Sequence, residues 1–131
     1  MIAVGPFKLT IFEIMSKQTL RPPNKAAIRR NAKMFAALGD ETRLQLLLKL
    51  SSGAPLSIKQ LTTDLVVTRQ AVTKHLRVLE GAQFVTKESH GRESRFSVQK
   101  STVEEASTAI NAIAQQWENA LLRLKNFVET K

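Results

Sequence analysis

Residues 57–98 read SIKQLTTDLVVTRQAVTKHLRVLEGAQFVTKESHGRESRFSV, and this stretch decides the fold. Within it, residues 68–80 place Val72, Leu76 and Leu79 at four- and three-residue spacings. That periodicity predicts an amphipathic helix with one face buried against the rest of the chain. The opposite side of the same segment is rich in cations and other hydrogen-bond donors, so its two faces are expected to do different things.

A shorter helix is predicted just before this one. Ser57 and Gln60 have the spacing of a capping box, in which each side chain bonds a backbone group of the first helical turn. Thr68 has the residue type of an N-cap for the second helix, after a short connection. The order is therefore a helix, a tight turn and a second helix whose outer face is basic.

Two strands are predicted after the second helix, which we expect to close at Gly81 in the left-handed conformation. Residues 84–89 and 95–98 flank a polar turn at residues 90–93, and apolar and polar residues alternate in the second segment. Together these signals predict a mostly α-helical winged helix-turn-helix, with five or six helices and a small β-hairpin wing.

The outer face of the second helix suits base edges and phosphates in a DNA major groove, because arginine bonds guanine bidentately and glutamine bonds adenine. The alternative is an ordinary solvated helix face. Arg92, at the tip of the hairpin, is placed to contact a minor groove or a phosphate, or else is a solvated turn residue. The donors on the helix face are Arg69, Gln70, Thr73, Lys74 and Arg77.

The charge distribution favours an anionic partner. The 131-residue chain has a formal net charge of +9. Residues 24–100 hold fourteen Lys or Arg against six Asp or Glu, whereas residues 101–131 hold three against four. Nucleic acid fits this basic motif region better than a membrane, because no stretch approaches the roughly 20 apolar residues of a spanning helix. The chain has no cysteine, in keeping with the reducing cytoplasm, where we expect it to act.

Three further helices are predicted around the motif, over residues 24–38, 41–50 and 101–128. Ser101 and Glu104 have capping-box spacing at the start of the last one. In the middle one, four leucines are expected to be buried: Leu44, Leu47, Leu48 and Leu50.

The last helix carries a long apolar stripe that is expected to be buried. Two ways of burying it are possible: packing against the first helix of the same chain, or pairing with a second copy across a two-fold axis. The stripe consists of Ile110, Ile113, Trp117, Leu121, Leu124 and Val128.

From residue 37 to residue 98 the sequence resembles the ArsR-type winged-helix repressors of bacteria. The resemblance is carried by ALGDETRLQLLLKL at 37–50, TRQAVTKHLRVLEGAQFV at 68–85 and the wing GRESRFSV at 91–98. It spans roughly half of the chain. The run AIAQQWENALLRLKNFVE at 112–129 further resembles a subgroup without metal sites, often encoded beside small lipid- or hydrophobe-binding proteins.

The resemblance implies a homodimeric, sequence-specific DNA-binding regulator, usually a repressor, in which the first and last helices build the dimer. The residues then expected at DNA are Ser57, Lys59, Thr68, Arg69, Gln70, Thr73, Lys74, Arg77 and Arg92. The residues then expected at the dimer interface are Ile28, Phe35, Ile110, Ile113, Trp117, Leu121 and Leu124.

Two departures from the founding members argue against metal sensing. Ser57 and Lys59 stand where arsenic and cadmium sensors place a Cys-x-Cys pair, and the chain has only two histidines, His75 and His90. Neither a thiolate site nor a histidine-rich site can be built from such a chain, so we expect no metal and no other cofactor. For His75, a packed histidine that fixes its helix is favoured over a base contact.

Residues 24–131 are expected to form one winged-helix domain whose dimerisation helices are 24–38 and 101–128. Three interpretations stay open for residues 1–23: an extra dimer-packing arm, a mobile tail or an artefact of start-codon choice. The sequence shows none of the patterns typical of an enzyme: a nucleophile with a base, paired carboxylates or a phosphate-binding glycine loop. An enzyme is therefore not expected. The rival function is a winged helix that docks on a protein. DNA is favoured because the outer face of residues 68–80 is cationic and lacks an aromatic anchor.

Overall fold

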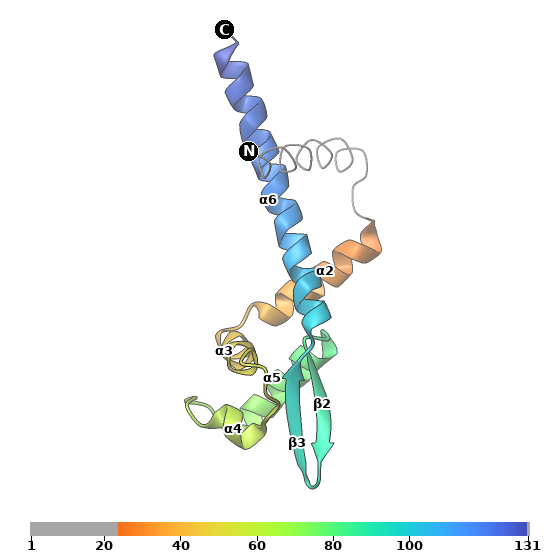
Figure 1. Ribbon diagram of the computed structural model, residues 1–131, viewed down its shortest axis with the longest axis vertical. Coiled ribbons are helices and arrows are strands. Elements are labelled where there is room, and N and C mark those ends of the chain that lie inside the picture. Colours follow the sequence, from red (N-terminus) through yellow and green to blue (C-terminus); the bar gives the residue numbers. More distant parts are fainter. Residues whose placement is uncertain (1–23, 131) are drawn as a thin grey trace. The chain divides into compact units, whose positions relative to one another are not determined.

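The computed structural model describes residues 24–130 (Figure 1). The chain divides into two compact units. One unit is residues 29–106. The described residues of the other are 24–28 and 107–130. The predictions for residues 1–23 lie outside the described residues.

The described residues form five helices and three strands, in agreement with the winged helix-turn-helix that the sequence predicts. The strands form one antiparallel sheet in the order β1-β3-β2, and the β2–β3 hairpin projects from the helical part of residues 29–106 (Figure 1). The elements are α2 (Lys25–Leu38), α3 (Glu41–Leu50), β1 (Leu56–Ser57), α4 (Ile58–Thr62), α5 (Arg69–Gly81), β2 (Val85–His90), β3 (Glu93–Val98) and α6 (Lys100–Glu129).

Local capping signals place the helix starts of the motif correctly. Ser57 is the N-cap of α4, and both hydrogen bonds of its capping box with Gln60 are present. Thr68 is the N-cap of α5, where its hydroxyl accepts from the backbone N–H of Ala71 at 3.0 Å. These caps satisfy N–H groups that have no partner within the helix.

Two predicted helix ends are wrong. Gly81 belongs to α5, and the left-handed residue is Gln83, with φ of 67°. Gln83 is the left-handed residue of a Schellman motif, in which the N–H of Phe84 donates to Leu79 O and the N–H of Gln83 donates to Glu80 O, both at 2.9 Å. Helix α6 begins at Lys100, so Ser101 lies inside its first turn, and the described residues form no Ser101–Glu104 capping box.

The core of residues 29–106 lies where α2, α3, α4 and α5 meet the sheet. The predicted buried face of α5 is confirmed, because Val72, Leu76 and Leu79 are each at most 1% exposed. The other large side chains that are fully buried are Met34, Leu46, Leu50, Leu61, Phe84 and Val85.

The prediction for α3 is half wrong. Leu47 and Leu50 are buried as expected, but Leu44 is 46% exposed and Leu48 is 72% exposed. Leu46 is buried instead. Successive helical residues point about 100° apart, so consecutive leucines cannot all face one core.

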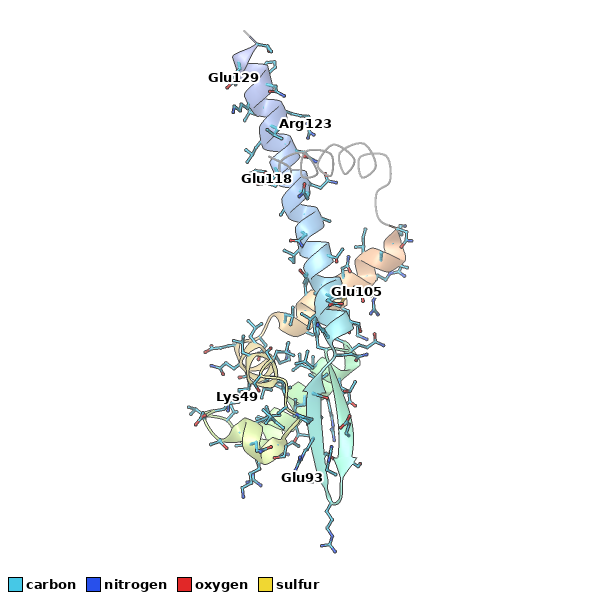
Figure 2. The ribbon with its side chains drawn as sticks, in the orientation of Figure 1. Lys49, Glu93, Glu105, Glu118, Arg123 and Glu129 are labelled. Carbon is cyan, nitrogen blue, oxygen red and sulfur yellow. The ribbon has the colours of Figure 1, made fainter. Side chains whose placement is uncertain are left out.

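In the other unit, α6 presents an apolar stripe to solvent. Trp117 is 66% exposed, and the other stripe residues are also exposed. Charged side chains share this stretch of the helix, among them Glu118, Arg123 and Glu129 (Figure 2). Although α6 is 30 residues long, none of the helices within residues 24–130 is apolar enough over sufficient length to cross a membrane.

Candidate nucleic-acid interface

Helix α5 is oriented by its buried face. Its stripe of Val72, Leu76 and Leu79 is buried where α5 contacts α3, α4 and β2. The buried stripe sets which side of the helix faces the core, so the other side must face outward. Arg69 and Arg77 are accordingly exposed, at either end of that outer side.

The outer side of α5 gathers most of the predicted DNA contacts. Gln70 and Lys74 are exposed and lie one turn apart. Thr73 is half-buried, and its hydroxyl donates to the backbone oxygen of Arg69 at 2.9 Å. Thr68 is exposed beside them at the N-cap. The helix therefore presents two guanidinium groups, one ammonium group and one amide on a single face.

These cations have no counter-ion within residues 24–130. The side chains of Arg69, Lys74 and Arg77 form no ion pair or hydrogen bond with any residue in that range, and neither do those of Lys59 and Arg92. Lys59 lies on α4, and Arg92 lies in the two-residue turn between β2 and β3. Exposed cations without ion-pair partners, contributed by α4, α5 and the wing, are typical of a surface that binds phosphates.

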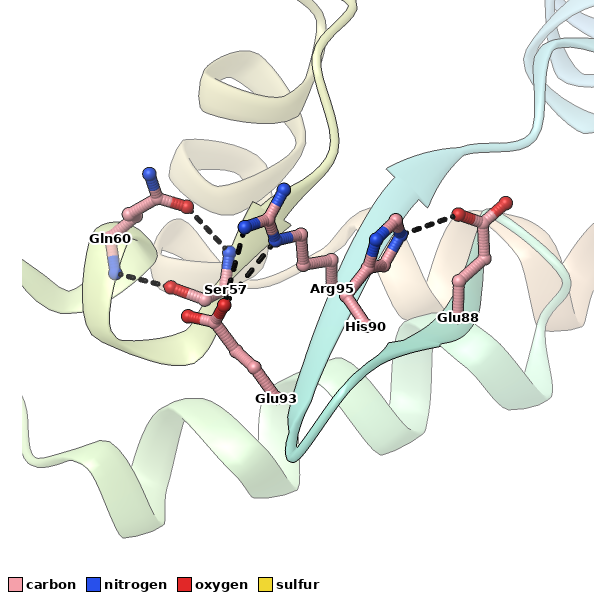
Figure 3. A network of polar contacts seen from close by, with 6 residues as sticks. All are labelled: Ser57, Gln60, Glu88, His90, Glu93 and Arg95. Carbon is pink, nitrogen blue, oxygen red and sulfur yellow. Dashed lines mark hydrogen bonds and ion pairs between the residues drawn. The ribbon is translucent and has the colours of Figure 1, made fainter.

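Ser57 departs from its predicted role. It is 3% exposed, and its Oγ accepts from the backbone N–H of Gln60 at 3.2 Å while its own N–H donates to Gln60 Oε1 at 2.9 Å (Figure 3). A buried hydroxyl already used for capping is poorly placed for DNA. We therefore correct its role to that of an N-cap and omit it from the interface.

The wing has its own internal polar contacts. His90 Nε2 lies 3.1 Å from Glu88 Oε1, and Arg95 donates to Glu93 Oε1 through Nη2 at 3.3 Å (Figure 3). Arg95 is a cation that sequence reasoning did not place at the interface, although its position in the strand pattern was visible. Its pairing with Glu93 distinguishes it from Arg92, which has no such partner within the described residues.

His75 lies on the inner flank of α5. It is half-buried, and its Nδ1 is 3.1 Å from Arg43 Nη1 and 3.7 Å from Asp40 Oδ2. His75 is therefore packed against the start of α3, as the first of its two predicted alternatives has it. The backbone N–H of Arg43, which donates to Asp40, is the main cause that lowers the pKa of the Asp40 carboxyl, and the charge of Arg43 lowers it further.

A second charged contact joins α2 to α6 within residues 29–106. Arg30 binds the Glu105 carboxylate with two nitrogens, and the Nη2–Oε1 distance is 2.7 Å. This hydrogen-bonded pair raises the pKa of Arg30 and lowers that of Glu105. Arg30, Lys33, Met34 and the end of α5 line a small hollow of about 90 Å³ beside it.

The predicted dimer residues fall into two groups. Ile28 and the predicted residues of α6 are exposed, whereas Phe35 is partly buried against the core of its own chain. Within residues 24–130, no cluster of three or more His, Asp or Glu side chains is arranged to hold a metal ion.

Comparisons with known proteins agree with this geometry. Residues 38–88 match a family model described as a helix-turn-helix domain. The solved structure of an ArsR-like transcriptional regulator from Rhodococcus sp. RHA1 is 32% identical, with a TM-score of 0.68. The match covers 78% of this chain and 95% of that one.

Two proteins of Bacillus subtilis (strain 168) are similar in sequence. An uncharacterized HTH-type transcriptional regulator is 45% identical over 65 residues, which cover 45% of this chain and 71% of that protein. The arsenical resistance operon repressor is 30% identical over 71 residues, which cover 54% of this chain and 68% of that protein. Each of these three proteins is named as a transcriptional regulator or repressor.

Proposed function

The chain belongs to the ArsR family of winged helix-turn-helix transcriptional regulators, a DNA-binding rather than an enzymatic family, and we propose that it is a repressor that binds an inverted-repeat operator as a homodimer. We further propose that it acts in the cytoplasm and needs no metal cofactor. The observation that carries the proposal is the outer face of α5, where Arg69, Lys74 and Arg77 are exposed without a counter-ion in the described part of the chain.

In the proposed complex α5 lies in the major groove. Arg69 and Gln70 sit in its first turn, and in helix-turn-helix proteins the N-terminal residues of the recognition helix contact base edges. Arginine distinguishes guanine and glutamine distinguishes adenine by two hydrogen bonds each. Thr68 and Thr73 flank these two residues on the same side of the helix.

The remaining cations are assigned to the DNA backbone. Lys59 on α4, Lys74 and Arg77 on α5 and Arg92 in the wing are exposed and belong to three separate elements. Contacts from several elements fix the register and orientation of a protein on the duplex but carry no sequence information of their own.

The homodimer is proposed from the apolar stripe of α6. Exposed tryptophan, isoleucine and leucine side chains on one helix are expected to pair with a second copy, which buries the same stripe twice across a two-fold axis. Two recognition helices related by that axis would enter successive major grooves about 34 to 36 Å apart. The operator is therefore expected to be an imperfect inverted repeat. Ile28 and Phe35 are proposed as further dimer contacts.

The proposal that this chain represses transcription rests on its similarity to the arsenical resistance operon repressor. We do not propose that it responds to arsenic compounds as the name of that relative suggests. Arsenite binds soft thiolate ligands, and this chain has no cysteine. The proposed regulator therefore differs from that relative in what controls it, and a regulator without any small-molecule signal is compatible with the same DNA-binding surface.

Selection of binding sites from random duplex DNA tests the proposal. We expect enrichment of an inverted repeat whose half-sites are one helical turn apart. The variant Lys74→Ala/Arg77→Ala should lose binding, while the matched control Lys33→Ala/Lys100→Ala, which removes two exposed cations from other elements, should bind like the wild type. Enrichment of no sequence, or equal loss in both variants, would contradict the proposed function.

A further inference from the structure

Arg43 connects three helices. Its Nε donates to the backbone oxygen of Ala37 at 2.6 Å, and its Nη2 lies 3.4 Å from that of Ala36. Both oxygens belong to the last turn of α2, where carbonyls lack partners within the helix. Arg43 itself stands in the first turn of α3, so it ties the end of one helix to the start of the next.

The third contact of Arg43 reaches α5. Its Nη1 lies 3.1 Å from His75 Nδ1. Because a guanidinium group only donates hydrogen bonds, Nδ1 must accept, and the ring proton then belongs on Nε2. Asp40 Oδ2 lies farther from the same Nδ1, at 3.7 Å, and accepts from the backbone N–H of Arg43 at 3.1 Å. The arrangement therefore makes His75 Nδ1 the acceptor of a hydrogen bond from Arg43.

This contact is unusual for its helix. Within the described range, His75 is the only side chain of α5 that forms a hydrogen bond or an ion pair with another element. The other contacts of α5 with the core are apolar, and apolar packing does not depend on direction. A hydrogen bond between a planar guanidinium group and an imidazole ring does depend on direction, so it restricts the small rotations and the sliding that apolar packing leaves open.

We propose that His75 is a positioning residue for DNA recognition: by accepting from Arg43 it holds α5 at the angle at which its outer face matches the base edges. This inference rests on the proposed function. His75 lies between Thr73 and Arg77 in the sequence of α5, and therefore within the stretch that it would align. Its own ring does not contact DNA.

Two substitutions separate the hydrogen bond from the volume of the ring. His75→Leu fills a similar space but cannot accept from Arg43. His75→Asn places its Oδ1 close to the position of the histidine Nδ1 and can accept. We expect His75→Leu to lose roughly tenfold in affinity for the selected operator, the size expected for a hydrogen bond to a charged group, with a much smaller change on random duplex. His75→Asn should recover most of that preference.

The tautomer gives a second, independent measurement. In full-length protein labelled with ¹⁵N-histidine, the neutral ring of His75 should carry its proton on Nε2, and Arg43→Gln should change the Nδ1 shift. A neutral ring protonated on Nδ1 would overturn the contact itself. Thermal melting of every variant accompanies both measurements, because a merely structural role would lower stability and reduce binding to operator and random duplex alike.

The outcomes distinguish this inference from the function on which it rests. If the wild type prefers its operator and His75→Leu prefers it equally, or if His75→Asn loses as much preference as His75→Leu, the positioning role is wrong and the proposed function stands. If the wild type shows no operator preference, the proposed function fails, and the positioning role fails with it.

Discussion

Helix α5 and the part of α6 beyond residue 106 are both amphipathic, yet they treat their apolar faces in opposite ways. The stripe of α5 is fully buried by its own chain, and its polar face is exposed. On α6, Trp117 and Leu121 are exposed although they lie at the same four-residue spacing. The periodicity of apolar residues thus predicts that a helix face will be buried, but it does not say whether the same chain or another molecule buries it. We assign the cover of α5 to its own core and that of α6 to a second copy.

The largest effect should come from truncating the stripe of α6. In Trp117→Ala/Leu121→Ala each loss recurs on the partner chain, and large-to-small changes at buried sites cost roughly 2 to 5 kcal/mol each. We expect a monomer that no longer binds the operator, because two half-sites are no longer held at fixed spacing. Sedimentation measured beside operator binding checks this. A double variant that stays dimeric and binds normally would show that the dimer is built elsewhere.

Truncating the stripe of α5 should have a different consequence. Leu76 is 1% exposed in the core of its own chain, so Leu76→Ala should lower the free energy of unfolding by about 2 to 5 kcal/mol. Urea denaturation measures that change, and sedimentation of the folded fraction should still give the dimer. If Leu76→Ala dissociated a dimer that remained folded, the two stripes would not differ as we describe.

The polar face of α5 should matter for sequence preference more than the wing does. We expect Arg69→Ala to cost about 1 to 3 kcal/mol on the preferred site and much less on random duplex, because a base contact is lost. Arg92→Ala should weaken both more evenly, since a backbone contact is lost. Titrations of both variants against both duplexes make the comparison. If Arg69→Ala lost equal affinity for the two duplexes, Arg69 would not be a residue that contacts bases.

The smallest effect concerns Glu105, which is bound by Arg30. Because the pKa of Glu105 is lowered in the folded chain, its stabilising contribution is present above its ordinary value of 4.5 and is lost as the pH falls through the lowered value. Melting temperatures below pH 5 should therefore fall less steeply in Glu105→Gln than in the wild type. Glu104→Gln, at the exposed neighbouring position, is the control and should follow the wild type.

Local signals in the sequence predicted the helix starts at Ser57 and Thr68, because a capping side chain needs only the next three residues. Features that depend on distant residues were missed. Strand β1 has only two residues and is defined by its pairing with β3. The left-handed residue Gln83 was missed for a different reason: its Schellman motif is local, but glycine is the usual residue there, and Gly81 lies two positions earlier.

In the candidate site, too, features set by local sequence were predicted and contacts between distant residues were not. The exposure of Arg69, Gln70, Lys74 and Arg77 on α5 follows from its periodicity and was predicted, whereas Thr73 is half-buried. The Arg43–His75 contact joins residues 32 positions apart, and no local pattern indicates such a contact. Ser57 illustrates the opposite error, since the family resemblance suggested a DNA contact, whereas burial and the capping box leave its hydroxyl occupied.

The dependence of DNA affinity on salt tests most directly the claim that α5 and the wing form a DNA-binding surface. Exposed cations that contact phosphates displace condensed counterions, so the logarithm of affinity should fall linearly with the logarithm of salt concentration, with a slope near −0.9 per phosphate contacted. We predict a steep slope for the wild type that becomes shallower by about one in Lys74→Ala. A flat dependence, or no binding to duplex DNA at low salt, would contradict the account and indicate a protein partner instead.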